Sequence, residues 1–124
     1  MKKIILLLFC IPLLLASTCD DENDEDIFCT TEFVYGLNVT VIDSQTQQLI
    51  VEGVTVTAQS GNYQETLEIF PGSEYVFYGA GERPGTYLIT VTKSGYVTNT
   101  ATVTVAADEC HVIPQQVQVV ITAN

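Results

Sequence analysis

Hydrophobic and polar residues alternate along most of the chain after about residue 33. The segment around Tyr87, Ile89 and Val91, with Leu88 and Thr90 between them, shows the pattern clearly. Alternation with period two sends successive side chains to opposite faces of a β-strand, so that one face of each strand is committed to a core. The pattern predicts seven strands, at 33–43, 52–60, 62–70, 74–79, 86–92, 96–105 and 112–122.

Turn-forming residues separate these segments. Clusters of Gly, Pro, Ser, Asn and Asp accept positive φ or preset the first position of a turn. They occur at 43–44, 60–62, 71–73, 79–81, 83–85 and 93–95. No stretch after Cys19 has the 3.6-residue apolar period of a helix. Short strands joined by many turns predict an all-β, antiparallel, two-sheet sandwich.

The start of the chain has a different composition. Lys2 and Lys3 precede an unbroken apolar run of twelve residues from Ile4 to Leu15, and small residues follow up to Cys19. Twelve residues at about 1.5 Å each are too few to span a bilayer core of about 30 Å, so this layout predicts a signal peptide. Directly after Cys19, six of the seven residues in 20–26 are acidic.

Residues 15–19, Leu-Ala-Ser-Thr-Cys, resemble a bacterial lipobox, and the acids behind them resemble the export signal of Bacteroidetes lipoproteins. The resemblance implies cleavage before Cys19, lipidation of Cys19 and a lipid-anchored protein of the outer membrane that is exposed on the cell surface. The alternative is an ordinary signal-peptidase site and a periplasmic or secreted product. The predicted organisation is a signal peptide at 1–18, an acidic flexible tether at 19–32 and a domain at 33–124.

A second resemblance covers about Gly36 to Thr122. The stretches "GLNVTVIDSQTQQLIVEGVTVTA" and "PGTYLITVTKSGY" are similar to the carboxypeptidase regulatory-like domain of the transthyretin-like (prealbumin-like) group. This resemblance implies a seven-stranded antiparallel Greek-key β-sandwich. Large rings and tight-turn glycines in these motifs, such as Tyr87, Gly95 and Tyr96, are interpreted as packing residues rather than ligand contacts.

Two thiols remain once Cys19 carries lipid and the signal peptide with Cys10 is removed. Cys29 and Cys110 then share an oxidising, exported compartment. Each precedes a terminal strand of the predicted sandwich, and if those strands run side by side the two cysteines meet at one end. We expect a disulfide; the alternative is a pair of buried thiols. A zinc site from these cysteines and His111 is disfavoured, because three ligands without a spacing motif fit tetrahedral coordination poorly.

Charge and chemistry exclude several functions. The chain has 15 acidic residues against four lysines and arginines, a net charge of −11, so it lacks the basic face that nucleic acid requires. His111 is the only histidine, and no motif places a Ser or free Cys beside it. Glu65 and Glu68 are three residues apart in a predicted strand, so their side chains are expected on opposite faces. Both are interpreted as solvated charges. The sequence predicts no catalytic residue, metal or cofactor.

The resulting hypothesis is a non-catalytic, lipid-anchored protein of the cell envelope. Its membrane contact is the N-terminal lipid, and its sandwich contacts another protein or a polysaccharide. The alternatives are a small carbohydrate- or peptide-binding module and a purely structural envelope component. For a binding module the candidate residues are Tyr75 and Phe77, provided that both are exposed on one strand face while Val76 and Tyr78 point inward. The wider candidate face adds Tyr63, Phe70 and Tyr78.

Overall fold

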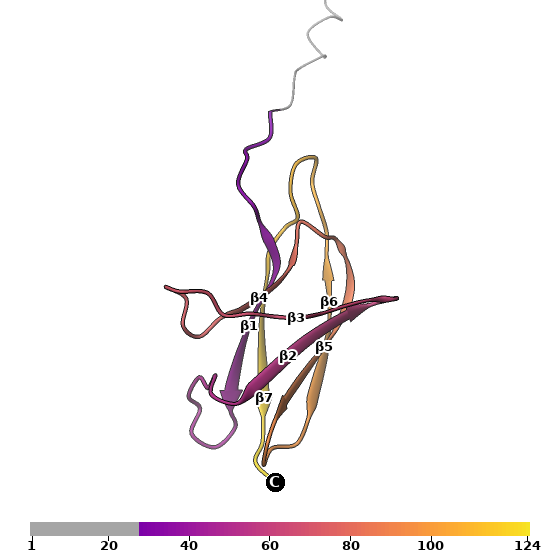
Figure 1. Ribbon diagram of the computed structural model, residues 1–124. Helices are drawn as coiled ribbons and strands as arrows, with labels where there is room; N and C mark the ends of the chain where they lie inside the picture. The colour runs from indigo at the N-terminus through magenta and orange to yellow at the C-terminus, as the bar shows by residue number, and fades with distance from the viewer. Residues whose placement is uncertain (1–27) are drawn as a thin grey trace, which may run out of the picture.

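The computed structural model describes residues 28–124 of the chain, which form seven strands in two layers (Figure 1). The predicted signal peptide, Cys19 and the acidic run at 20–26 lie outside the described residues. The predicted all-β, two-sheet architecture is confirmed. The strands are β1 (Tyr35–Asp43), β2 (Val54–Ser60), β3 (Tyr63–Thr66), β4 (Phe77–Gly81), β5 (Gly85–Lys93), β6 (Asn99–Val105) and β7 (Gln115–Ile121).

The two sheets differ in strand direction. The four-stranded sheet has the order β3-β2-β5-β6, and every pair in it is antiparallel. The three-stranded sheet has the order β4-β1-β7, with β1 antiparallel to β4 and parallel to β7. Val39 lies opposite Val117, and Val41 lies opposite Val119.

The prediction of a purely antiparallel sandwich is therefore wrong for the three-stranded sheet. Parallel neighbours need a long crossover connection, whereas a short hairpin suffices for antiparallel ones. The chain between β1 and β7 supplies that crossover: β2, β3, β5 and β6 lie in the second sheet, and β4 lies on the other side of β1, before β7 returns beside β1. Period-two patterning reports which face of a strand is buried and carries no information about strand direction.

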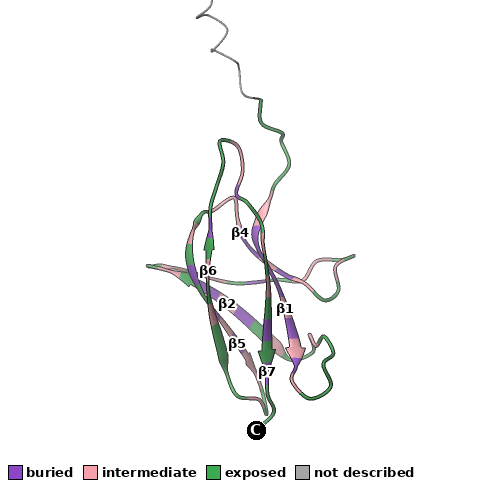
Figure 2. Cartoon of the chain, turned by 180° about the vertical axis from the view of Figure 1, so that it is seen from behind, coloured by how far each residue is buried: buried purple, intermediate pink, exposed green. Residues whose placement is uncertain are grey.

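The core lies between the sheets and is built from alternate residues of the strands (Figure 2). In β5, Tyr87, Ile89 and Val91 are fully buried, whereas Leu88 is 45% exposed. This confirms the period-two pattern from which the strand was predicted. The hydroxyl of Tyr87 donates a 2.8 Å hydrogen bond to the backbone carbonyl of Arg83, so the buried ring leaves no unpaired polar atom.

Strand β4 is displaced relative to its prediction. The segment 79–81, which the sequence predicts to be a turn, belongs to the strand, and Gly79 and Gly81 pair with Leu37 and Tyr35 of β1. A Cβ atom at Gly79 would clash with the carboxylate of Glu65, and one at Gly81 would clash with the ring of Phe33. The glycines therefore serve the close approach of side chains to the strand rather than a reversal of the chain.

Asp43 and Tyr96, which come from the two quoted motifs, contact each other. One carboxylate oxygen of Asp43 accepts hydrogen bonds from the amides of Gln45 and Thr46, at 2.7 and 3.1 Å. The other accepts one from the Tyr96 hydroxyl at 2.5 Å. The bond from Tyr96, followed by those from the two amides, lowers the pKa of Asp43. Tyr96 thus has a structural role at the turn that follows β1.

The expected disulfide is confirmed between Cys29 and Cys110, whose Cα atoms lie 5.2 Å apart. Because β1 and β7 run in the same direction, the segments that precede them emerge at the same end of the sheet (Figure 1). The disulfide joins those two segments. It closes a loop with a sequence separation of 81 residues, which makes its effect on the entropy of the unfolded chain large.

Replacing both Cys29 and Cys110 by Ser is expected to lower the free energy of unfolding by about 4 kcal/mol, since the unfolded chain regains the entropy of the opened loop. Urea denaturation of the wild-type chain and the double variant measures the difference. Dithiothreitol should destabilise the wild type by the same amount and leave the double variant unchanged. A loss below about 1 kcal/mol would contradict this role of the disulfide.

Candidate functional site

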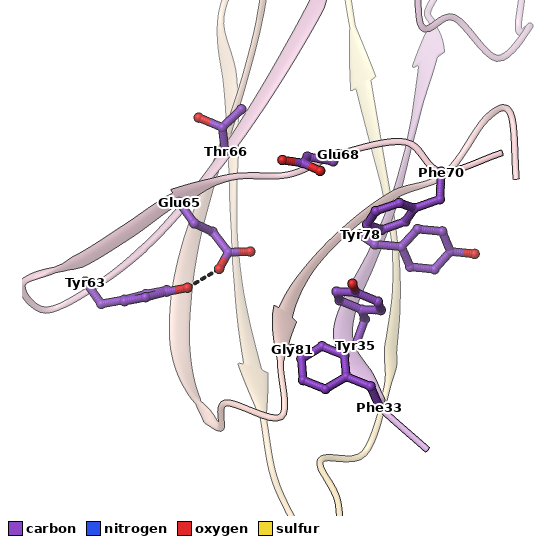
Figure 3. Close-up of a pocket in the computed structure, with 9 residues that line it drawn as sticks. All are labelled: Phe33, Tyr35, Tyr63, Glu65, Thr66, Glu68, Phe70, Tyr78 and Gly81. Atoms are coloured by element: carbon purple, nitrogen blue, oxygen red, sulfur yellow. Dashed lines mark hydrogen bonds between the residues drawn. The ribbon is translucent and has the colours of Figure 1, made fainter. Parts of the chain in front are cut away.

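A cleft of about 380 Å³ opens where β3 approaches β4 and the start of β1 (Figure 3). We call it the aromatic cleft. Its aromatic lining consists of Phe33, Tyr35, Tyr63, Phe70 and Tyr78. The remaining lining residues are Glu65, Thr66, Glu68 and Gly81. Figure 3 shows the two carboxylates on one side of the cleft and the rings of Phe33, Tyr35, Phe70 and Tyr78 on the other.

Four of the rings form a continuous cluster. The ring centroids of Phe33 and Tyr35 lie 5.1 Å apart in an edge-on arrangement. Tyr35 also lies 5.4 Å from Phe70 and 5.5 Å from Tyr78, and the last two lie 5.8 Å from each other. These separations are typical of favourable aromatic pairs. Phe33 remains 62% exposed, so the cluster presents apolar surface to the cleft rather than completing the core.

Tyr63 and Glu65 belong to the opposite wall, and Arg83 contacts Tyr63 from outside the lining. The hydroxyl of Tyr63 donates to the Glu65 carboxylate, which also accepts a 2.8 Å bond from the amide of Ala80. The hydrogen bond to Glu65, with a further contribution from burial, raises the pKa of Tyr63. The guanidinium carbon of Arg83 lies 3.8 Å from the centre of the Tyr63 ring, a cation–π contact.

Glu68 reaches the same cleft from just beyond the end of β3. Its backbone exchanges two hydrogen bonds with Tyr78, at 2.8 and 3.1 Å, which fixes it beside β4. Burial still alternates beyond the end of β3 at Thr66, since Leu67 is buried and Glu68 is exposed, whereas Glu65 is half-buried. The expectation of opposite faces is therefore consistent with the burial pattern, although both residues line the cleft and Glu65 is not a freely solvated charge. Within residues 28–124 the Glu68 carboxylate forms no ion pair.

The aromatic residues singled out from the sequence separate into three locations. Phe77 is 4% exposed and belongs to the core, whereas Tyr75 is 49% exposed and lines a different cleft beside Leu49 and Lys93. Tyr75 and Phe77 therefore do not share an exposed face. Tyr63, Phe70 and Tyr78 of the wider candidate face do come together in the aromatic cleft.

Sequence reasoning missed Tyr35 at the start of β1 and Phe33 just before it. Their signal lies in β4, where Gly81 is opposite Tyr35 and leaves space for the ring of Phe33. A Gly-x-Gly segment close to aromatic residues therefore has two interpretations. It is either a turn or a strand whose missing side chains leave space for large neighbouring ones. The sequence alone favoured the turn.

A second cluster lies beside the disulfide. The Nδ1 atom of His111 is 2.6 Å from a carboxylate oxygen of Glu82, and its Nε2 atom is 2.9 Å from the Thr30 hydroxyl. Glu82 also accepts hydrogen bonds from the amides of Val34 and Val112, at 2.9 and 3.4 Å. The hydroxyl, imidazole and carboxylate follow the order of a catalytic triad.

The electrostatics of this cluster favour a structural role. The hydrogen bond to Glu82 raises the pKa of His111, against a smaller opposing effect of burial. Burial raises the pKa of Glu82, but the bonds from His111 and the two amides outweigh it, so the pKa of Glu82 is lowered overall. A raised pKa of His111 and a lowered pKa of Glu82 both favour the ion pair between the two side chains. None of the three clefts described on residues 28–124 is lined by these residues.

The contacts of Cys29 and Thr30 attach these two residues to the sandwich, although both lie in the segment 19–32 predicted to be a tether. Among the described residues, no group of three or more His, Cys, Asp and Glu side chains is placed to hold a metal ion. The same part of the chain contains no helix that is long and apolar enough to cross a membrane.

Comparison with known proteins gives no family for the chain. A scan against protein-family models and a search of curated proteins both found no match.

The His111–Glu82 pair is expected to make stability depend on pH. Since the pKa of His111 is raised above its ordinary 6.5, its contribution is full below pH 6.5 and is lost as the pH rises through the folded-state value. Since the pKa of Glu82 is lowered from 4.5, its contribution is present above pH 4.5 and is lost on further acidification. The pair therefore stabilises the fold most between about pH 4.5 and 6.5.

An NMR titration measures this effect, because the chain has one histidine and its Hε1 signal is unambiguous. The His111 midpoint should lie above 6.5 in the wild type and move back toward 6.5 in Glu82→Gln. The matched variant Glu74→Gln, which removes an exposed carboxylate elsewhere, should leave it unchanged. Equal midpoints in all three proteins would contradict the pairing.

Proposed function

We propose that this chain is a non-catalytic, lipid-anchored protein of the cell envelope whose sandwich binds its partner through the aromatic cleft. The observation that carries the proposal is the cleft itself. Ligand sites combine apolar and aromatic walls with a few convergent polar groups, and the aromatic cleft has this composition. Tyr and Phe rings that stay open to solvent beside carboxylates are suited to binding, since they gain from burial by a ligand.

The membrane anchor is supported by the sequence before the described residues. Two or three acyl chains on Cys19 would hold the protein firmly, at about 0.8 kcal/mol for each buried methylene. Nine residues separate Cys19 from Cys29, where the disulfide attaches the chain to the sandwich. Nine extended residues reach at most about 30 Å, and their repelling carboxylates favour an extended state. The domain would therefore act close to the membrane surface.

The assignment to the carboxypeptidase regulatory-like domains, within the transthyretin-like group, is part of the same proposal. It rests on the order of the two motifs, and the hydrogen bond between Asp43 and Tyr96 supports it by connecting them. A non-catalytic role is supported by the position of His111 and Glu82, which line none of the three clefts described on residues 28–124.

The anchor is tested by expressing the full chain in a Bacteroidetes host and measuring the intact mass of the protein in the membrane fraction. We expect a chain that begins at Cys19 and carries acyl groups. Cys19→Ala should abolish acylation and release the protein from the membrane. Cys10→Ala, which changes a cysteine of the apolar run, is the matched control and should be acylated normally.

Surface exposure is tested on the same cells by adding a protease to the medium. Loss of the domain from intact cells, with a periplasmic marker protein left undigested, is the expected result. An unmodified soluble product in the wild type would overturn the anchor, and an acylated but protease-protected domain would overturn surface exposure.

A further inference from the structure

We infer that the aromatic cleft binds a cationic side chain, a lysine or arginine on a basic segment of a partner protein. This inference rests on the proposed function and specifies the ligand of the same site. Three features of the described residues carry it: the cluster of rings that lines the cleft, an internal cation on the neighbouring ring and an acidic side chain without a cation.

The rings of Tyr35, Phe70 and Tyr78 provide the first feature. Aromatic faces carry negative electrostatic potential, and a cation within about 6 Å of a ring centre is attracted to them. The three ring centres lie within 5.8 Å of one another, so a single ammonium or guanidinium group at the cleft contacts more than one ring. Phe33, at 62% exposure, flanks the same opening and adds a fourth ring.

Arg83 provides the second feature, because it shows the same chemistry inside the protein. Its guanidinium lies 3.8 Å from the centre of the Tyr63 ring, and the Tyr63 hydroxyl donates to Glu65. Cation, ring and carboxylate are thus already combined beside the cleft. Glu68 lies across the cleft from the other rings, and no cation of residues 28–124 is paired with its carboxylate.

The third feature is the Glu68 carboxylate, for which the described residues offer no free cation. Arg83 is engaged with Tyr63, and Lys93 donates to the Glu52 carbonyl at 2.5 Å, so both basic residues after the predicted signal peptide have partners elsewhere. With 15 acidic residues in the chain, the long-range field attracts basic partners and repels acidic ones. A neutral sugar would also stack on the rings, but it would form no ion pair with Glu68.

The test is a titration of the full ¹⁵N-labelled chain, in micelles of a detergent with a neutral headgroup, with acetylated tetralysine amide. We expect saturable shifts of the Phe33, Tyr35 and Gly81 amide signals. Tetraglutamine amide and maltotetraose, as uncharged probes, should leave these signals in place. Shifts confined to the acidic segment 20–26 would reveal attraction by the tether alone and would overturn the inference.

Two pairs of variants locate the binding energy. Phe33→Ala and Glu68→Gln should each raise the Kd for tetralysine about two- to fivefold, the effect of one exposed cation–π contact or ion pair. The matched controls are Phe28→Ala and Glu74→Gln, which remove the same groups from exposed positions outside the cleft. They should leave the Kd unchanged, and equal effects within a pair would overturn the assignment to the cleft.

The outcomes separate this inference from the proposed function. If maltotetraose shifts the cleft signals and tetralysine does not, the cleft is a binding site for a neutral ligand and the cationic ligand is excluded. If tetralysine binds in the cleft while the intact mass shows no acylation, the cationic ligand is supported and the lipid anchor is overturned. If neither probe shifts the cleft signals, the inference is overturned.

Discussion

The parallel pairing of β1 with β7 is the constraint on which the rest of the structure depends. It places the first and last strands side by side with both running in the same direction, from Tyr35 and Gln115 onward. Their preceding segments therefore leave one end of the sheet together, where Cys29 bonds to Cys110 and His111 contacts Glu82. An antiparallel pair would send these segments to opposite ends and allow neither contact.

The aromatic cleft follows from the other neighbour of β1. Strand β4 pairs with β1 so that Gly81 lies opposite Tyr35, and the missing side chain at Gly81 leaves space for the ring of Phe33. The backbone bonds between Glu68 and Tyr78 bring the chain after β3 to the same place, so the cleft forms where the two sheets meet at one corner. Rings and carboxylates from distant parts of the sequence thereby face each other.

Local patterns in the sequence predict most of the fold and little of the site. The burial of Tyr87, Ile89 and Val91 follows from period two, because alternation is a property of a single strand. Strand direction and the partners of a side chain are not local properties, so the sequence predicts an antiparallel β7 and leaves open whether Phe77 faces the core or the solvent. The cysteines did hold the missing information: two cysteines that each precede neighbouring strands can meet only if those strands are parallel.

Interstrand NOEs between β1 and β7 test this arrangement most directly. Parallel pairing predicts contacts that advance together along both strands, Val39 with Val117 and Val41 with Val119, and no short Hα–Hα contacts between the strands. Contacts that advance in opposite directions, with strong Hα–Hα cross-peaks between facing residues, would show an antiparallel pair. That result would contradict the position of Cys29 and Cys110 at the same end of the sheet. It would also contradict the placement of the segment that carries Phe33 into the cleft.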